Sequence, residues 1–233
     1  METIKRREDI YTFEEDGVRS FLILGKERAL AVDSGFGTYH LADAIKAVTD
    51  LPYLYVNTHS DMDHTGGNGA LEEIYAHEAE IPLLRERRPQ DPAVYVPVAE
   101  GTKFDLGGST WNVIHCPGHT PGSIALFNEE EGILLTGDTV SEANVYMFGG
   151  GRSHQDYKET LKKLGALDKQ VKIILPSHGP CPLAGLLELT EDLQKALEKY
   201  ESGLPEDERV GLRPGTEVKL FRHGRGAVLA EAI

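Results

Sequence analysis

Cysteine is scarce in this 233-residue sequence, and long apolar runs are missing from it. The two cysteines, Cys116 and Cys181, are too few for a disulfide framework, which favours a reducing compartment. No stretch approaches the roughly 18 consecutive apolar residues that a membrane-spanning helix needs. The first ten residues, METIKRREDI, also lack the apolar core of a signal peptide. We therefore expect a cytoplasmic protein with no membrane partner.

Positive charge is the second shortage. Lys and Arg number 24 against 38 Asp and Glu, which leaves a formal net charge of −14. A surface of this sign repels phosphate backbones at long range, although bound divalent cations would reverse the field locally. The composition therefore favours a small-molecule substrate over a nucleic-acid partner, and it leaves the oligomeric state open.

The remaining composition is that of a globular protein, with 40% hydrophobic residues. The length suits one domain spanning residues 1–233. Short apolar segments bounded by turn residues predict strands. These strands cover residues 10–13, 18–24, 29–32, 53–56, 102–105, 110–115, 123–127, 133–135 and 171–175. Apolar residues at helical spacing predict helices over residues 38–48, 154–167 and 183–200. This alternation predicts a layered α/β domain with two central sheets.

Three other segments complete the prediction. Residues 73–87 favour a short strand followed by a helix that ends in the basic run at residues 85–88, which we expect to face solvent because cations suit a helix C-terminus. Residues 89–101 contain three prolines and predict a surface loop. The tail predicts a hairpin with strands at residues 218–221 and 227–229.

The strongest chemical signal is T-H-S-D-M-D-H-T-G-G at residues 58–67, directly after a predicted strand. It places four potential metal ligands within six residues, namely His59, Asp61, Asp63 and His64. Imidazole and carboxylate together suit zinc, iron or manganese, and alternating ligand types on a tight loop favour two neighbouring ions. The alternative is a polar turn that caps a helix, with Asp63 as the N-cap.

Three more ligand-type residues follow strand ends further along the chain. His119 lies in the loop P-G-H-T-P-G-S, Asp138 follows the predicted strand at residues 133–135, and His178 follows the one at residues 171–175. α/β folds assemble their sites at such strand ends. A capping turn at residues 58–67 would leave all three positions unexplained.

The order and context of these motifs resemble the metallo-β-lactamase superfamily over nearly the whole chain. The turn Asp33-Ser34-Gly35 is similar to an early motif of that family, and residues 59–64 to its H-x-H-x-D-H signature. The resemblance implies a four-layer αββα sandwich with a cofactor of two divalent metal ions. It further implies that the first ion is held by His59, Asp61 and His119. The second would be held by Asp63, His64 and His178, with Asp138 bridging both.

Asp61 stands where the family signature has histidine. A carboxylate still binds metal, but it adds a negative charge and removes a nitrogen ligand. With Asp63 and Asp138 it makes three carboxylates, which moves the preference toward iron(II) or manganese relative to zinc. The alternative is that Asp61 is not a ligand and that only one metal binds tightly.

Two such ions imply hydrolysis, because a water that bridges them loses a proton near neutral pH and attacks a carbonyl or phosphoryl centre. Asp63 and Asp138 are the predicted catalytic residues. Asp63 would orient the nucleophile or pass a proton to the leaving group. Asp33 is predicted to fix a ligand imidazole by a hydrogen bond, a structural turn cap being the alternative.

Weaker candidates surround these residues. The segment 144–152 combines aromatic side chains, a glycine run and one cation, and we expect Tyr146 and Arg152 to line a substrate rim; a loop whose arginine pairs with a surface acid is the alternative. His115 and the two cysteines are expected to be ordinary core or rim residues. The histidines without a motif are expected at the surface or at helix ends: His40, His77, His154 and His223.

The predicted function is that of a metal-dependent hydrolase acting on a small ester, thioester, lactone or phosphodiester. Other branches of the family add a flavodoxin-like domain, a large insertion typical of nucleases, or a C-terminal helical domain. We expect none of these here, because the sequence predicts only one C-terminal helix and no such insertion. The rival hypothesis is a mononuclear iron dioxygenase, or a redox or sensor metalloprotein, of the same fold.

Overall fold

The computed structural model describes residues 1–213 and 216–231, and it divides into two compact units. The first unit comprises Met1–His115 and Gly122–Glu130, and the second comprises Cys116–Pro121 and Glu131–Ile233. Within the described residues, no helix is long and apolar enough to cross a membrane.

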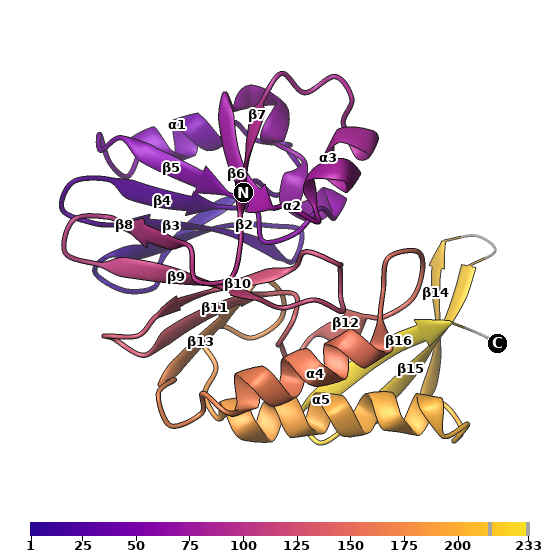
Figure 1. Ribbon diagram of the computed structural model, residues 1–233. Helices are drawn as coiled ribbons and strands as arrows, with labels where there is room; N and C mark the ends of the chain where they lie inside the picture. The colour runs from indigo at the N-terminus through magenta and orange to yellow at the C-terminus, as the bar shows by residue number, and fades with distance from the viewer. Residues whose placement is uncertain (214–215, 232–233) are drawn as a thin grey trace. The chain divides into compact units, whose positions relative to one another are not determined.

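A seven-stranded sheet forms the framework of the first unit, in the strand order β1-β2-β3-β4-β5-β6-β7 (Figure 1). Its strands are β1 (Glu2–Lys5), β2 (Ile10–Glu15), β3 (Val18–Leu24), β4 (Ala29–Val32), β5 (Tyr53–Val56), β6 (Glu73–His77) and β7 (Val94–Val98). Strands β1 to β4 pair antiparallel, and β4 to β7 pair parallel. The parallel half brings the loop after β4 and the loop after β5 to the same edge of the sheet.

Four helical segments belong to this unit. They are α1 (Leu41–Lys46), α2 (Met62–Thr65), the 3-10 turn η1 (Asn68–Ala70) and α3 (Ile81–Arg87). Ile45 of α1 and Leu84 of α3 are buried in one cluster with Tyr55 and Ile74 of the sheet. The same unit also contains an antiparallel set of three strands, β8 (Lys103–Asp105), β9 (Thr110–His115) and β10 (Ile124–Asn128).

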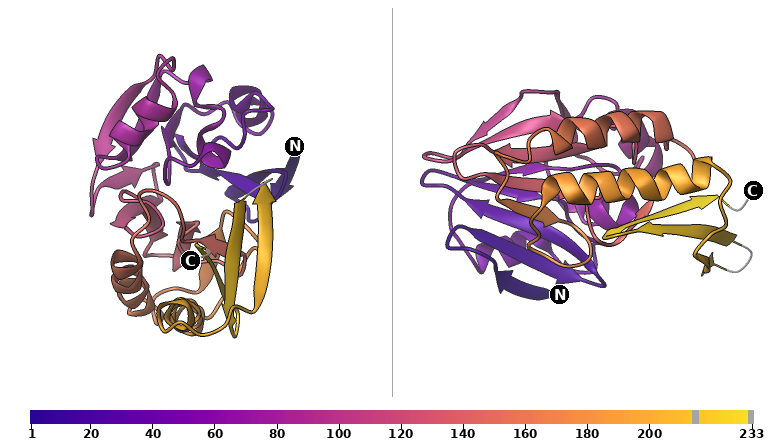
Figure 2. Two further views of the ribbon diagram at one scale, coloured as in Figure 1. Left: turned by 90° about the vertical axis from the view of Figure 1, so that its right-hand side faces the viewer. Right: turned by 90° about the horizontal axis from the view of Figure 1, so that it is seen from below.

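The second unit is built from a parallel pair, a four-stranded sheet and two long helices. The pair is β11 (Ile133–Gly137) with β13 (Ile173–Pro176), and the sheet has the order β12-β16-β15-β14. Its strands are β12 (Asn144–Tyr146), β14 (Glu208–Arg213), β15 (Thr216–His223) and β16 (Gly226–Glu231). Helices α4 (His154–Gly165) and α5 (Leu186–Glu201) lie side by side in both directions of view (Figure 2), and α5 packs on β15 and β16.

Most of the predicted elements agree with this arrangement. The predicted strands at Val18–Leu24, Ala29–Val32, Tyr53–Val56 and Thr110–His115 match to the residue. The loop predicted at residues 89–101 is wrong, because it contains β7. This strand is the last in the order of its sheet and pairs only with β6, so the missing N–H of Pro97 costs no inter-strand bond on the open side.

Two glycines allow the loop after β4 to touch the loop after β5. A Cβ on Gly66 would lie 2.0 Å from the carbonyl carbon of Phe36, and one on Gly37 would lie 2.3 Å from the carbonyl oxygen of Gly66. Gly66 N–H also donates to Gly35 O at 2.8 Å. This close backbone contact holds the segment that follows His64.

We predict that Gly66→Ala lowers the free energy of unfolding by roughly 1–3 kcal/mol, because the added methyl group forces two backbone segments apart. Urea unfolding of the metal-free protein measures the change. Gly150→Ala is the matched control, since its Cβ would meet nothing within 4 Å, and it should change stability by less than about 0.5 kcal/mol. Equal stability of the two variants would contradict the close contact.

Candidate functional site

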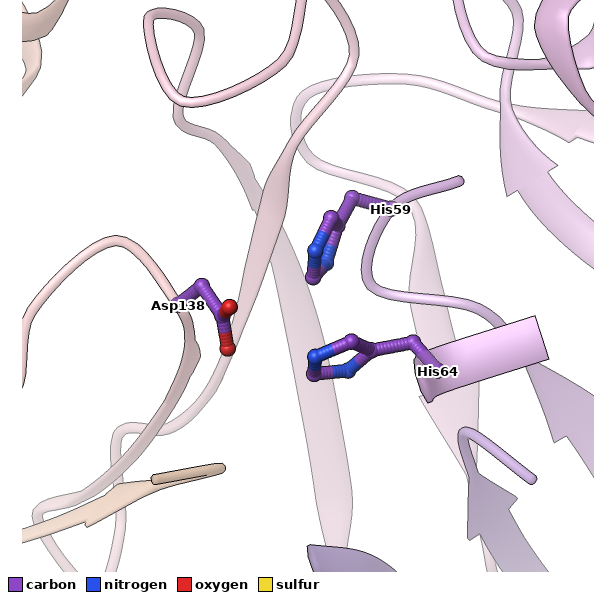
Figure 3. A group of neighbouring side chains, drawn as sticks. All are labelled: His59, His64 and Asp138. Carbon is purple, nitrogen blue, oxygen red and sulfur yellow. The ribbon is translucent and has the colours of Figure 1, made fainter. Parts of the chain in front are cut away.

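The first ligand group, His59, Asp61, Asp63 and His64, lies on the loop after β5 and on the short helix α2 that follows. Both imidazoles are buried, with at most 1% of each residue exposed. Their ring centroids are 4.1 Å apart and the rings are tilted by 49° (Figure 3). The capping role considered for Asp63 is not seen, because the N-cap of α2 is Asp61, whose side chain makes no capping hydrogen bond.

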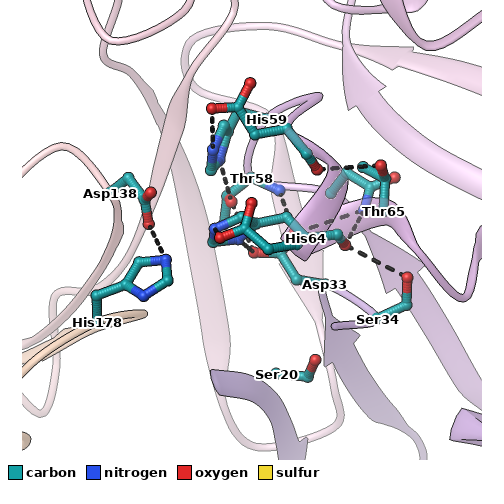
Figure 4. A network of polar contacts seen from close by, with 12 residues as sticks. Ser20, Asp33, Ser34, Thr58, His59, His64, Thr65, Asp138 and His178 are labelled. Carbon is teal, nitrogen blue, oxygen red and sulfur yellow. Dashed lines mark hydrogen bonds and ion pairs between the residues drawn. The ribbon is translucent and has the colours of Figure 1, made fainter. Parts of the chain in front are cut away.

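A buried carboxylate, Asp33, holds this loop (Figure 4). Asp33 Oδ2 accepts from His64 Nδ1 at 2.8 Å and from Thr58 Oγ1 at 2.7 Å, while Oδ1 accepts from Thr58 N–H at 2.8 Å. Its backbone φ of 61° is unusual for a residue with a side chain and marks a position under local strain. Asp33 therefore makes a hydrogen bond to the imidazole of His64, one of the candidate ligands.

The same hydrogen bonds set the proton positions of both histidines. Thr58 uses its hydroxyl proton on Asp33, so its oxygen accepts from His59 Nδ1–H at 3.0 Å. His64 Nδ1–H likewise donates to Asp33. Each imidazole therefore has its Nε2 lone pair available for a metal, the arrangement typical of histidine ligands.

The buried side-chain amides of Asn57 and Asn68 form hydrogen bonds that support this loop. Asn57 Nδ2 donates to His64 O at 3.2 Å and to Tyr55 Oη at 2.8 Å, and Asn68 Nδ2 donates to Asn57 Oδ1 at 2.8 Å. Ser34 Oγ donates to Asn68 Oδ1 at 3.0 Å. Burial raises the pKa of Tyr55 well above its ordinary value, so its hydroxyl stays protonated and donates to Asn68 Oδ1.

Each imidazole of the first ligand group faces a carboxylate at a distance that suits a shared ion. His59 Nε2 lies 3.7 Å from Asp61 Oδ2, and His64 Nε2 lies 3.6 Å from Asp63 Oδ2. Both distances are too long for good hydrogen bonds. Two ligand atoms on one tetrahedral zinc ion, each about 2.1 Å from it, are about 3.4 Å apart. The donor set therefore fits divalent metal binding.

One member of the basic run at residues 85–88 reaches this group. Arg87 Nη1 donates to Asp61 Oδ1 at 2.9 Å, to Ser60 O at 2.7 Å and to Ser60 Oγ at 3.2 Å. Arg87 is exposed, as expected for this run, but its guanidinium also has partners on the ligand loop. The helical pattern placed this residue in the last turn of α3 but contained no signal for its partner.

The second ligand group consists of His119, Asp138 and His178. His119 follows the turn at Pro117-Gly118, which docks on α4: Thr160 Oγ1 donates to Pro117 O at 2.7 Å, and a Cβ on Gly118 would lie 2.4 Å from Tyr157 Cα. His119 Nδ1–H donates to Tyr146 O at 2.9 Å, so its Nε2 also carries the lone pair.

Asp138 lies one residue beyond β11, and His178 lies two residues beyond β13, which pairs with β11. Asp138 Oδ2 is 3.7 Å from His119 Nε2, and Asp138 Oδ1 is 3.4 Å from His178 Nε2 (Figure 4). The two oxygens of one carboxylate thus face two different imidazoles. A carboxylate that bridges two metal ions needs this property.

The rim candidates and the other histidines occupy distinct positions. Tyr146 is 41% exposed and its ring lies 5.4 Å from that of Phe148, while its carbonyl holds His119. Arg152 directly precedes Ser153, the N-cap of α4. The surface position expected for His77 is wrong: its ring is buried and stacks on His115 at 3.9 Å, and burial lowers its pKa.

Comparison with known proteins identifies the family. The model of the metallo-β-lactamase superfamily matches residues 14–178, so the chain belongs to this superfamily. The predicted fold class, the αββα metallo-β-lactamase fold, is confirmed. A metallo-β-lactamase family protein from Thermus thermophilus shares the fold with a TM-score of 0.72 and 21% identity, over 85% of this chain and 82% of that one.

The curated relatives are hydrolases. Acyl-coenzyme A thioesterase MBLAC2 of Gallus gallus is 31% identical over 206 residues, which cover 71% of this chain and 74% of the relative. Hydroxyacylglutathione hydrolase of Hyphomonas neptunium is 29% identical over 180 residues, which cover 76% of this chain and 67% of the relative. The predicted enzyme class, a hydrolase of this superfamily, is confirmed.

We predict that Asp33→Asn weakens zinc binding roughly 10- to 100-fold. The amide NH2 would replace the oxygen that accepts from His64 Nδ1 and Thr58 Oγ1, so His64 would lose its orientation. Competition with a chromophoric chelator measures the affinity, and circular dichroism confirms that the variant is folded. Asp43→Asn, at an exposed carboxylate on α1, is the control and should bind zinc like the parent. Unchanged affinity in a folded Asp33→Asn protein would show that Asp33 only caps a turn.

Proposed function

We propose that the chain is a hydrolase of small thioesters that uses two divalent metal ions. The observation that carries the proposal is the set of four imidazole Nε2 atoms, each 3.4–3.7 Å from a carboxylate oxygen of its own ligand group. The names of the relatives, an acyl-coenzyme A thioesterase and a hydroxyacylglutathione hydrolase, support a thioester substrate. The family match runs through both ligand groups, which supports their acting as one domain over residues 1–233.

The proposed ligands divide between two ions. His59, Asp61 and His119 would hold the first. Asp63, His64 and His178 would hold the second. Asp138 would contribute to both, which agrees with its oxygens facing different histidines. The ions are zinc, iron or manganese, because the donors are imidazole nitrogens and carboxylate oxygens.

When bound, the two ions supply a strong nucleophile from water at neutral pH and polarise the carbonyl of the thioester. The protein keeps the ligands in place: Asp33 and Thr58 fix the imidazoles of the first ligand group, and Tyr146 O fixes His119. Asp63, 25% exposed, would accept the proton that water gives up as its oxygen bonds to the carbonyl carbon. Cleavage of the C–S bond would then release the thiolate. A thiol has a pKa of roughly 8.5, so this leaving group needs little help from an acid.

The proposal includes the setting of the enzyme. The substrate is a small molecule, the enzyme acts in the cytoplasm, and neither nucleic acid nor membrane is a partner. The net charge of −14 supports the exclusion of nucleic acid.

We predict two metal ions per chain and a larger loss from Asp138→Ala than from His178→Ala, because removing the bridge weakens both ion sites. Elemental analysis of protein purified without added metal, and acyl-thioester hydrolysis followed with a thiol reagent, measure the effects. His178→Ala should keep about one ion, and Asp138→Ala should keep less than one. At most one ion in the metal-replete parent would overturn the dinuclear proposal, and oxygen consumption with one bound iron would support the dioxygenase instead.

We predict that Arg152→Ala raises KM for an acyl-coenzyme A, with a smaller change in kcat. Loss of a charge-assisted hydrogen bond to an anionic group costs about 1.5–3 kcal/mol, roughly ten- to hundredfold in kcat/KM. The N-acetylcysteamine thioester of the same acyl group carries no such charge, so its kcat/KM should stay the same. Arg209→Ala, on β14, is the matched surface control. Equal losses on both substrates would exclude Arg152 as the anion contact.

A further inference from the structure

We propose that Arg87 is a positioning residue for Asp61, and that the two residues together replace the neutral histidine of the family signature. This inference rests on the proposed metal binding by Asp61. The guanidinium of Arg87 binds one carboxylate oxygen and leaves the other as the ligand atom. The pair carries no net charge, so the ion that Asp61 holds meets the same total charge as in a site with histidine at this position.

The division of the carboxylate is visible in the distances. Arg87 Nη1 donates to Asp61 Oδ1 at 2.9 Å, whereas Asp61 Oδ2 lies 3.7 Å from His59 Nε2. One oxygen is therefore occupied by the arginine, and the other lies at the spacing of two ligands on one ion. The side chains of Asp61 and Arg87 are 20% and 35% exposed, so the interaction is partly screened by solvent.

Arg87 is well placed to hold its partner. It lies in the last turn of α3, a helix anchored in the core by Leu84. The same Nη1 atom donates to Ser60 O and Ser60 Oγ, so the arginine binds the backbone immediately before Asp61 as well as its side chain. The guanidinium is planar and carries several N–H donors in one plane, which suits it to hold a carboxylate and a backbone carbonyl together.

This pairing changes what the aspartate implies for the metal. Counted alone, Asp61 adds a negative charge and favours harder ions such as iron(II) or manganese. With the Arg87 charge 2.9 Å away, the excess negative charge is cancelled locally. The pair therefore removes the electrostatic part of that preference, and zinc stays a suitable occupant.

Two single variants and the double variant test the pair in the metal-loaded enzyme. One readout is the pH dependence of kcat/KM for an acyl-thioester, and in particular the pH at which activity falls on the acidic side, its acidic limb. Arg87→Met makes the site one charge more negative, so it holds a proton more tightly and the limb should move up by about 0.5–1 pH unit. Asp61→His makes the site one charge more positive, and the limb should move down. The double variant restores the parent charge, and its limb should return to within about 0.3 pH unit of the parent value. Arg85→Met removes a neighbouring arginine, which lies over the Tyr95 ring, and should leave the limb unmoved.

A second readout needs neither metal nor activity. In metal-free protein, Arg87→Met should lower the thermal midpoint by about 1–3 °C, because Asp61 loses its partner. The same substitution in the Asp61→His background should lower it clearly less. A crystal structure of the zinc-loaded parent should show Asp61 Oδ2 on zinc and Oδ1 on Arg87.

Three outcomes would overturn the pair while the proposed function stands. Equal midpoint losses in both backgrounds would mean that Arg87 only braces the loop through Ser60. A limb that Arg87→Met leaves unmoved would exclude charge compensation. A zinc-loaded parent with both Asp61 oxygens on Arg87 would exclude ligation. A parent that takes up no metal would overturn the proposed function, and the role of the pair with it.

Discussion

The orientation of the first ligand group depends on the hydrogen bonds that the carboxylate of Asp33 accepts. This carboxylate is fully buried, and it accepts from four donors: His64 Nδ1–H, Thr58 N–H, Thr58 Oγ1–H and, at 3.5 Å, Asn57 Nδ2–H. A buried charge is costly unless its oxygens accept such hydrogen bonds, so the carboxylate and its donors stabilise one another. Because Thr58 gives its proton to Asp33, its oxygen is left to accept from His59. A single side chain thus decides which ring nitrogen of the two histidines carries the proton and which carries the lone pair.

The second ligand group reaches the same result with a backbone carbonyl. His119 Nδ1–H donates to Tyr146 O, the last residue of β12, and β12 pairs with β16 near the C-terminus. The C-terminal hairpin therefore contributes to the orientation of a histidine more than a hundred positions earlier in the chain. In both units the ligands are oriented by contacts within the unit itself. Such preorganisation reduces the entropy that metal binding must overcome.

Two kinds of feature were predicted well from the sequence: elements with a regular apolar pattern, and residues that directly follow a predicted strand. Strands with a high apolar content, such as β3 and β5, were predicted to the residue, and each candidate ligand was located by its place after a predicted strand. Strands β1, β7, β12 and β14 were not predicted, because they are short, polar or contain proline, and partner strands determine them. Thr58 and Arg87 were missed for a related reason. Their roles depend on which atoms lie within 3 Å, and distance in space leaves no periodic trace in a sequence.

Asp61 illustrates how a departure from a signature depends on its surroundings. Taken alone, a carboxylate in place of an imidazole adds a charge, and the expected consequence is a preference for harder metal ions. The guanidinium of Arg87 lies 2.9 Å from that carboxylate, and its separation of 26 positions hides the pairing from any local pattern. The net charge of the chain is −14, and Arg87 places one positive charge beside Asp61, which lies next to His59. This cation limits the negative charge beside the candidate metal ligands. The effect of an aspartate at position 61 therefore depends on a second residue, Arg87, which the signature does not include.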